Sequence, residues 1–158
     1  MALNVDIRRY KPEDQEESRE LIKSSVKTIE GYSTEKISHL KKVLPDMVTG
    51  FASDDEFKFY VAEANDEIRG LAGIETRTGT IGGIFVHPEY KEEGIGTRLM
   101  NRLEHEAQKA DVDEMEVNAS ISAKKFYEKN GFRVIKRDAD HKIEGRKIAV
   151  YKMRKGLK

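Results

Sequence analysis

Apolar and polar residues alternate along several short stretches of the chain, and this two-residue period predicts β-strands. Alternation is clear from Asn4 to Tyr10, and residues 57–64 are rich in the aromatic and β-branched residues that strands favour. Asn65 begins a polar turn, and Gly79 lies in a predicted hairpin turn. The predicted strands cover residues 4–10, 57–64, 68–76, 81–86, 115–118, 132–135 and 147–153.

A helical period marks two stretches before residue 57. The first begins at Pro12, because an early proline followed by acidic residues favours helix initiation, and we expect it to run to Gly31. Ser33 or Thr34 can cap the second. Since a proline removes one helical hydrogen bond, we expect Pro45 to interrupt this second helix.

Two more helices are predicted in the second half of the chain. The shorter covers residues 123–129, and the longer begins near Gly94. The longer helix is amphipathic, with apolar residues spaced four apart: Ile95, Leu99, Leu103 and Ala107. The predicted order is β-α-α-β-β-β-α-β-α-β-β, which indicates a mixed α/β (α+β) domain with helices against one sheet.

Composition narrows the class of protein. The chain has 158 residues, so we expect residues 1–158 to form a single domain. It has no cysteine, which excludes disulfides and thiolate chemistry. Lysine plus arginine total 29, as do aspartate plus glutamate. The net charge is therefore zero, without the basic excess typical of proteins that bind nucleic acid, so no nucleic-acid partner is expected.

Neither a membrane segment nor a metal site is expected. No stretch approaches the roughly 20 apolar residues that span a bilayer, and no N-terminal run resembles a secretory signal. We therefore expect a cytoplasmic protein with no membrane partner. His39, His105 and His141 lie on separate predicted elements without ligand spacing, so no metal is inferred.

The segment from Ile84 to Met100 carries the main chemical signal. A predicted strand ends at Val86, and Gly94 and Gly96 bracket the start of the long helix. Glycines at this place remove Cβ atoms where the first N–H groups of the helix point outward. Those donors, with the positive end of the helix dipole, are suited to bind phosphate.

Two side chains add to this predicted phosphate site. Lys91 supplies a mobile cation, and Thr97 supplies a hydroxyl donor. The turn lacks the third spaced glycine of a Rossmann turn and the Gly-Lys-Ser/Thr ending of a P-loop, so another nucleotide-containing ligand is indicated. A tight strand-to-helix turn without a ligand is the other interpretation of the glycine pair.

Residues 86–99 resemble the acyl-CoA-binding segment of the GNAT N-acetyltransferase superfamily. That signature is Arg or Gln, two residues, Gly, one residue, then Gly or Ala; Lys91 stands in the first position, and both glycines match. The resemblance implies a mixed, mostly antiparallel central sheet and acetyl-CoA as the acyl donor. It also implies that backbone groups bind the pyrophosphate and the pantetheine arm. The residues implied are Ile84, Phe85, Val86, Lys91, Glu92, Glu93, Gly94, Ile95, Gly96 and Thr97.

Residues 118–132 resemble a later motif of the family, in which a short helix carries a tyrosine before Gly-Phe. The matching residues are Ala123, Phe126, Tyr127, Gly131 and Phe132. The resemblance implies that Tyr127 lies near the CoA sulfur and protonates the departing thiolate. A tyrosine packed in the core with its hydroxyl satisfied is the alternative.

The family often has a cofactor-contacting asparagine seven residues before this tyrosine. Ser120 stands there in this sequence, and Asn118 lies two positions earlier. Both are candidate cofactor contacts. Ser120 can instead cap the following helix, and Asn118 shares its side of the strand if the strand continues that far.

The attacking amine must first lose a proton, and family members often use a carboxylate or a relayed water for this step. Gly82 and Gly83 leave no acid on the strand before the turn, and they widen the space there or mark a bulge. Glu75, across the hairpin, is the candidate base; an ordinary exposed strand residue is the other interpretation. The resemblance implies that the two N-terminal helices line the acceptor site. Tyr32 is therefore a candidate substrate contact, or a turn aromatic packed on the core.

The resemblance predicts an N-acetyltransferase that moves an acetyl group from acetyl-CoA to a primary amine of a small molecule or protein, by direct attack. It implies acetyl-CoA and an amine as partners, and it allows a homodimer, which is common in the family. Two alternatives on the same fold are a non-catalytic acyl-CoA-binding sensor and a protein-interaction domain.

Overall fold

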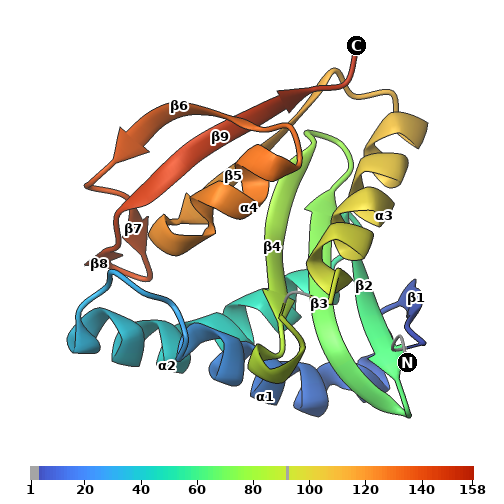
Figure 1. Ribbon diagram of the computed structural model, residues 1–158, viewed down its shortest axis with the longest axis horizontal. Coiled ribbons are helices and arrows are strands. Elements are labelled where there is room, and N and C mark those ends of the chain that lie inside the picture. Colours follow the sequence, from blue (N-terminus) through green and yellow to red (C-terminus); the bar gives the residue numbers. More distant parts are fainter. Residues whose placement is uncertain (1–3, 92) are drawn as a thin grey trace.

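The computed structural model describes residues 4–91 and 93–158, and a seven-stranded sheet forms the centre of the molecule (Figure 1). Its order is β1-β2-β3-β4-β5-β9-β6, and all neighbours except β4 and β5 are antiparallel. The strands are β1 (Asp6–Arg9), β2 (Phe57–Ala64), β3 (Glu67–Glu75), β4 (Thr80–Val86), β5 (Glu114–Ser120), β6 (Arg133–Asp138) and β9 (Val150–Gly156). This confirms the predicted mixed, mostly antiparallel sheet.

Helices flank the sheet in the predicted order. The α-helices are α1 (Gln15–Val26), α2 (Thr34–Ala52), α3 (Ile95–Lys109) and α4 (Lys124–Lys129). Short 3-10 turns precede three of them: η1 (Pro12–Asp14), η2 (Pro88–Tyr90) and η3 (Ile121–Ala123). In Figure 1, α3 and α4 lie in front of the sheet, and α1 and α2 run along its lower side.

Each face of the sheet has its own apolar core, because successive side chains of a strand point to opposite faces. In β2, Tyr60 and Ala62 join the core beneath α3, and Phe59 and Val61 join the core beneath α1 and α2. The face of α3 predicted to be buried is buried, with each residue at most 1% exposed: Ile95, Leu99, Leu103 and Ala107.

The predicted interruption at Pro45 is wrong, because α2 continues through it to Ala52. A proline inside a helix forfeits one backbone hydrogen bond. Pro45 is nevertheless buried, on a helix whose Leu40 and Val48 belong to the core. The Thr49 hydroxyl donates to the Pro45 carbonyl at 2.8 Å. The free energy gained when the helix packs against the sheet exceeds the local cost of the missing hydrogen bond.

Several boundaries also differ from the prediction, most clearly those of the first helix and the last strand. The first helix ends at Val26 rather than Gly31. The polar connection before the last strand forms a small hairpin, β7 (Lys142–Ile143) and β8 (Arg146–Lys147). Its turn residues have φ of 47° and 81°, as hairpin turns of this size prefer. The last strand of the main sheet therefore begins at Val150 rather than at Lys147.

Candidate functional site

The sheet is open between its two parallel neighbours, β4 and β5. They pair at one position, Thr80 with Glu116, where the Glu116 N–H donates to the Gly79 carbonyl at 3.0 Å. Past that point the two strands diverge (Figure 1). As a result β4 is only half-buried from Gly82 to Val86, whereas its neighbour β3 is buried along most of its length. A central strand exposed in this way lines a gap in the sheet.

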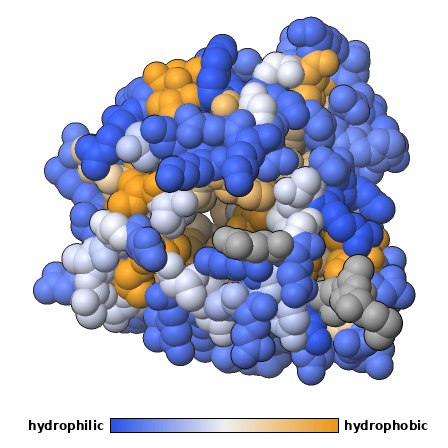
Figure 2. Space-filling model, in the orientation of Figure 1, coloured by the Kyte–Doolittle hydropathy of each residue, from blue (hydrophilic) through white to orange (hydrophobic). Residues whose placement is uncertain are grey.

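The surface is hollowed in the middle of the same view. Figure 2 shows a recess at the centre of this face, with apolar residues visible inside it and a mostly hydrophilic rim. Recesses with an apolar interior and a few polar groups are typical of small-molecule sites. The gap between β4 and β5 is therefore the candidate functional site.

The backbone of β4 turns polar groups toward this gap. The His87 N–H donates to the Arg69 carbonyl of β3 at 2.8 Å. In an antiparallel pair, alternate residues bond the same neighbour, so Phe85 also turns its backbone groups to β3. Ile84 and Val86 turn theirs the other way, toward β5, which has already diverged. Of these three predicted cofactor contacts, Ile84 and Val86 therefore direct their backbone groups toward the gap, whereas Phe85 does not.

A bulge in β4 lies beside this open backbone. Gly73 pairs with Gly83 and Ile74 pairs with Ile81, so Gly82 has no partner in β3. Gly83 has φ of +133°, and a Cβ there would lie 2.6 Å from the Phe85 ring. This confirms the bulge interpretation of the glycine pair. A bulge takes backbone N–H and C=O groups out of the hydrogen-bond ladder between two strands. This bulge does so at the edge of the gap.

The two glycines of the turn after β4 have different roles. Gly94 precedes α3 with φ of +81°, and a Cβ there would meet nothing within 4 Å. A Cβ on Gly96 would lie 3.0 Å from the Phe126 ring, so that glycine allows α3 to pack on α4. Arg98 makes the first helical bond, to the Gly94 carbonyl. The N–H groups of the preceding three residues have no acceptor within the helix, as at the start of any α-helix.

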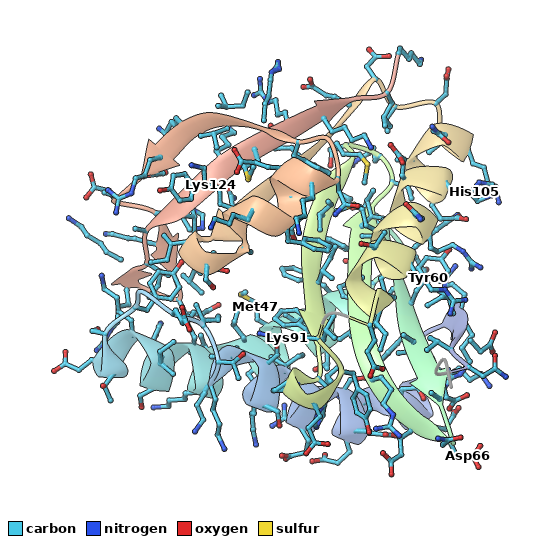
Figure 3. All side chains as sticks on the ribbon, in the orientation of Figure 1. Met47, Tyr60, Asp66, Lys91, His105 and Lys124 are labelled. Carbon is cyan, nitrogen blue, oxygen red and sulfur yellow. The ribbon has the colours of Figure 1, made fainter. Side chains whose placement is uncertain are left out.

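The other predicted residues of this turn lie around its mouth. Lys91 is exposed, and its ammonium donates to the Thr28 hydroxyl at 2.8 Å (Figure 3). Glu93 and Thr97 are exposed, whereas the Ile95 side chain is buried, so that only the backbone of Ile95 is available to a ligand. Glu92 lies outside the described residues, and its predicted contact stays a prediction.

Tyr127 is enclosed by aromatic rings in the core beneath α3. Phe126 and Phe132 meet its ring edge-to-face, with centroids 5.2 and 5.4 Å away, and the residue is 4% exposed. Burial raises the pKa of the Tyr127 phenol. The side chains of Ile84 and Val86 pack against the same core. Tyr127 therefore lies on the face of the sheet to which these β4 side chains point.

Asn118 and Ser120 share one side of β5, as the alternation predicts. Val117 and Ala119 fill the core that contains Tyr127, so Asn118 and Ser120 turn away from that core. Ser120 occupies the N-cap position of η3, but its hydroxyl makes no capping hydrogen bond. A cofactor contact from either side chain stays a prediction.

Glu75 lies at the end of β3, opposite Phe57 in β2 and Thr80 in β4. Directly paired residues point to the same face of a sheet, and Phe57 packs on the core beneath α1 and α2. Glu75 and Tyr127 therefore lie on opposite faces. The Glu75 carboxylate is 16% exposed and accepts a hydrogen bond from Arg77 at 3.1 Å.

Tyr32 connects separate parts of the chain. Its hydroxyl donates to the Ala149 carbonyl at 2.5 Å and accepts from the Ile121 N–H at 3.3 Å. These bonds join the α1–α2 loop to the segments before β9 and α4. Burial raises the pKa of the Tyr32 phenol. The structure shows the packed-aromatic interpretation, and a contact of Tyr32 with an acceptor stays a prediction.

An aromatic cluster beside the bulge was not found from the sequence. Phe51, at the end of α2, stacks on Phe57 with ring centroids 4.8 Å apart and an interplanar angle of 26°. A Cβ on Gly82 would lie 3.6 Å from the Phe57 ring. The signal that could have found it is the spacing of Met47 and Phe51, one turn apart on α2. The expected break at Pro45 concealed that spacing.

Residues 4–91 and 93–158 contain neither a cluster of metal-ligating side chains nor a membrane-spanning helix. Within that part of the chain, no group of three or more His, Asp or Glu residues is placed to hold a metal ion. No helix in the same residues has the length and apolar character needed to cross a membrane.

Comparison with known proteins gives one family. The family model of an acetyltransferase (GNAT) domain matches residues 28–157. An uncharacterized N-acetyltransferase of Escherichia coli (strain K12), YafP, is 25% identical over 140 residues, which cover 84% of each chain.

Solved structures share the fold. A GCN5-related N-acetyltransferase from Rhodopseudomonas palustris has a TM-score of 0.89 and 25% identity over 99% of both chains. The PaiA N-acetyltransferase from Thermoplasma acidophilum, in complex with coenzyme A, has a TM-score of 0.76 and 22% identity. That match covers 98% of this chain and 100% of the other.

Proposed function

The chain belongs to the GNAT family of N-acetyltransferases, and we propose that it transfers the acetyl group of acetyl-CoA to a primary amine by direct attack. The observation that carries this proposal is the half-buried central strand β4, which is followed by the start of α3, where the first N–H groups have no acceptor within the helix. Together they offer one continuous path for a long ligand with a phosphate at one end. The PaiA relative with coenzyme A bound has the same fold, which supports the choice of donor.

The turn before α3 would hold the pyrophosphate. The first N–H groups of α3 have no acceptor within the helix and lie at the positive end of its 15 residues, and the open space beside Gly94 admits an anion. Lys91 would exchange its bond to Thr28 for one to a phosphate oxygen. The residues present therefore fit a diphosphate.

The edge of β4 would hold the pantetheine arm. The N–H and C=O groups of Ile84 and Val86 face the gap, where the amides of the arm can bond to them as an added strand would. Acetyl-CoA supplies a thioester whose carbonyl carbon accepts the attacking amine. In this proposal, the thioester lies beside the bulge at Gly82 and Gly83.

Two side chains would move the protons, one on each face of the sheet. Glu75 accepts a proton from the ammonium, directly or through a water, so that the neutral amine can attack. Backbone N–H groups near Ile84 stabilise the oxyanion. Tyr127 donates its proton to the departing thiolate. An ordinary phenol, with a pKa of about 10, is already protonated at neutral pH, as an acid must be, and burial raises the pKa of Tyr127 further.

Release of free thiol from acetyl-CoA, measured with a panel of primary amines, tests this proposal. We expect release that depends on both the protein and the amine and that saturates with each substrate. The panel should pair each primary amine with its tertiary analogue, which cannot form a stable amide. Equal release with both, or no release with any primary amine, would contradict the proposed transfer.

A further inference from the structure

We infer that the acceptor is a monoamine bearing an aromatic or bulky apolar group, and that Phe51 and Phe57 bind this group. The inference rests on the proposed function, because it assigns the acceptor to the space beside the bulge of β4. It adds a substrate class and two specificity residues, which the family alone does not supply.

An exposed aromatic surface lies on the α1–α2 side of the sheet. Phe51 is 37% exposed, although it is a large apolar residue, and its ring stacks on Phe57. Phe57 is half-buried and lies against the fully packed Phe59, with ring centroids 6.2 Å apart. Phe59 therefore fixes Phe57, and Phe57 supports the exposed ring of Phe51. A supported ring with a free face is suited to stack on an aromatic ligand.

This aromatic surface adjoins the bulge of β4. A Cβ on Gly82 would lie 3.6 Å from the Phe57 ring, and a Cβ on Gly83 would lie 2.6 Å from the Phe85 ring. Both positions are glycine, so the rings approach the strand backbone itself. Phe85 is half-buried and packs on the same core as Phe57. An acceptor bound here would therefore present its nitrogen close to the backbone that is proposed to hold the thioester.

Helix α2 extends this surface with a second apolar side chain. Met47 lies one helical turn before Phe51 and is half-buried. Figure 3 shows Met47 directed from α2 toward the centre of the molecule. A thioether adapts to irregular apolar shapes and packs well on aromatic rings. We call Met47, Phe51, Phe57 and Phe85 the acceptor wall.

The charges beside the acceptor wall fit one ammonium group. Glu75 is paired directly with Phe57 across the sheet, so its carboxylate lies on the same face. It is 16% exposed and shared with Arg77. The wall itself is apolar, so a second ammonium of a polyamine lying on its rings would lose water without a polar group of the wall to replace it. The other carboxylate that contacts Arg77, Glu56, is 55% exposed and lies in solvent. The geometry favours a single amine with an apolar body.

Amine specificity of the wild-type protein is the first test. We expect kcat/KM for phenethylamine to exceed that for spermidine by at least about tenfold, and to exceed that for butylamine by a smaller factor, since small apolar contacts discriminate modestly. A higher kcat/KM for spermidine than for phenethylamine would overturn the inference and leave the proposed transfer intact.

Phe51→Ala is the second test, with Val134→Ala as its matched control. Both residues are 37% exposed, so neither change opens the core, and Val134 lies on the edge strand β6. We expect Phe51→Ala to raise the KM for phenethylamine on the order of tenfold and to leave the KM for acetyl-CoA unchanged. Phe57→Leu, which keeps apolar volume but removes the stacked ring, should act in the same direction.

Calorimetric binding of phenethylamine to protein saturated with coenzyme A separates the inference from the proposed function. Binding that weakens in Phe51→Ala but not in Val134→Ala supports the acceptor wall, even if no amine is acetylated. Absence of acetylation would overturn only the proposed transfer. Binding of equal strength in all three proteins, or no binding, overturns the acceptor wall whether or not turnover is observed.

Discussion

Tyr127 is the residue whose hydroxyl the proposed reaction needs most. Tyr127→Phe removes that hydroxyl and keeps the ring between Phe126 and Phe132, so the fold should persist. We expect kcat to fall by about 100- to 10,000-fold, the usual contribution of a general acid, with little change in the KM for acetyl-CoA. The measurement is steady-state thiol release. Tyr151→Phe, which removes the hydroxyl of a half-buried tyrosine on β9, should leave kcat unchanged.

A carboxylate outside the site controls acid stability. Asp14 is 8% exposed and accepts two bonds from the Arg8 guanidinium, at 2.8 and 2.9 Å, and one from the Lys11 N–H at 2.8 Å. The hydrogen bond from Arg8 is the main reason that the pKa of Asp14 lies below its usual value. Its charge therefore stabilises the fold above the unfolded-state pKa of about 3.9. That stabilisation is lost as the pH falls through the lower folded-state pKa.

Asp14→Asn should lower the free energy of unfolding at pH 7 by about 1–3 kcal/mol, since it weakens charge-assisted bonds in a buried place. Urea unfolding at a series of pH values measures the difference, which should shrink below about pH 4 as the wild-type carboxyl becomes protonated. Glu63→Gln removes the second, more exposed partner of Arg8 and should cost less. A difference for Asp14→Asn that stays constant down to pH 2 would show that its charge is not responsible.

At the scale of elements, the turn between β4 and α3 combines two glycines with separable roles. Gly94→Ala places a Cβ on a residue with φ of +81°, which costs about 1–2 kcal/mol of stability. We expect the KM for acetyl-CoA to rise as well, because relief of that strain would move the donors of the helix N-terminus. Gly94→Asn, which tolerates this conformation better, should recover most of both losses.

Thermal unfolding and KM for acetyl-CoA, measured on both Gly94 variants, check this prediction. If Gly94→Ala matched the wild type in both quantities, the left-handed turn would not shape the donor site. Gly96→Ala gives a contrast, because its Cβ would press on Phe126 at 3.0 Å. That variant should disturb the contact between α3 and α4 rather than the turn.

Helix α2 shows why a sequence rule applied to one residue, here Pro45, can conceal other residues of a site. The sequence correctly placed its start, with Ser33 accepting a bond from the Lys36 N–H as N-cap. The prediction of a break at Pro45 then took precedence over the apolar spacing that continues along the helix beyond that residue. Burial of one face against the sheet decides whether a helix tolerates proline, and that face is known only when the sheet is assembled. Met47 and Phe51 were missed for this reason.

At the scale of the whole molecule, much of the fold follows from pattern. The four-residue spacing in α3 predicted which of its side chains fill the core, and the aromatic and β-branched content of residues 57–64 predicted strand β2. The gap between β4 and β5 could not be predicted, because it depends on two strands that pair only at Thr80 and Glu116. The bulge at Gly82 was one of two interpretations, since only strand register decides between them.

The two faces of the sheet divide the proposed reaction. Tyr127 and the side chains of Ile84 and Val86 lie on the α3 side, and Glu75 and the aromatic rings of the acceptor wall lie on the α1–α2 side. Donor and acceptor would thus approach the gap from opposite faces and meet beside β4. Sequence order does not reveal this division, because strand pairing assigns Glu75 to its face and core packing assigns Tyr127 to the opposite face.

Transfer of an isotopically labelled acetyl group is the measurement that tests the central claim most directly. The wild-type protein is incubated with acetyl-CoA labelled in its acetyl group and with a primary amine, and the products are analysed by mass spectrometry. We predict that the label is recovered in an amide of the amine, with one free thiol released for each amide formed. Label that stays on CoA although acetyl-CoA binds, or that appears only as free acetate, would contradict the account.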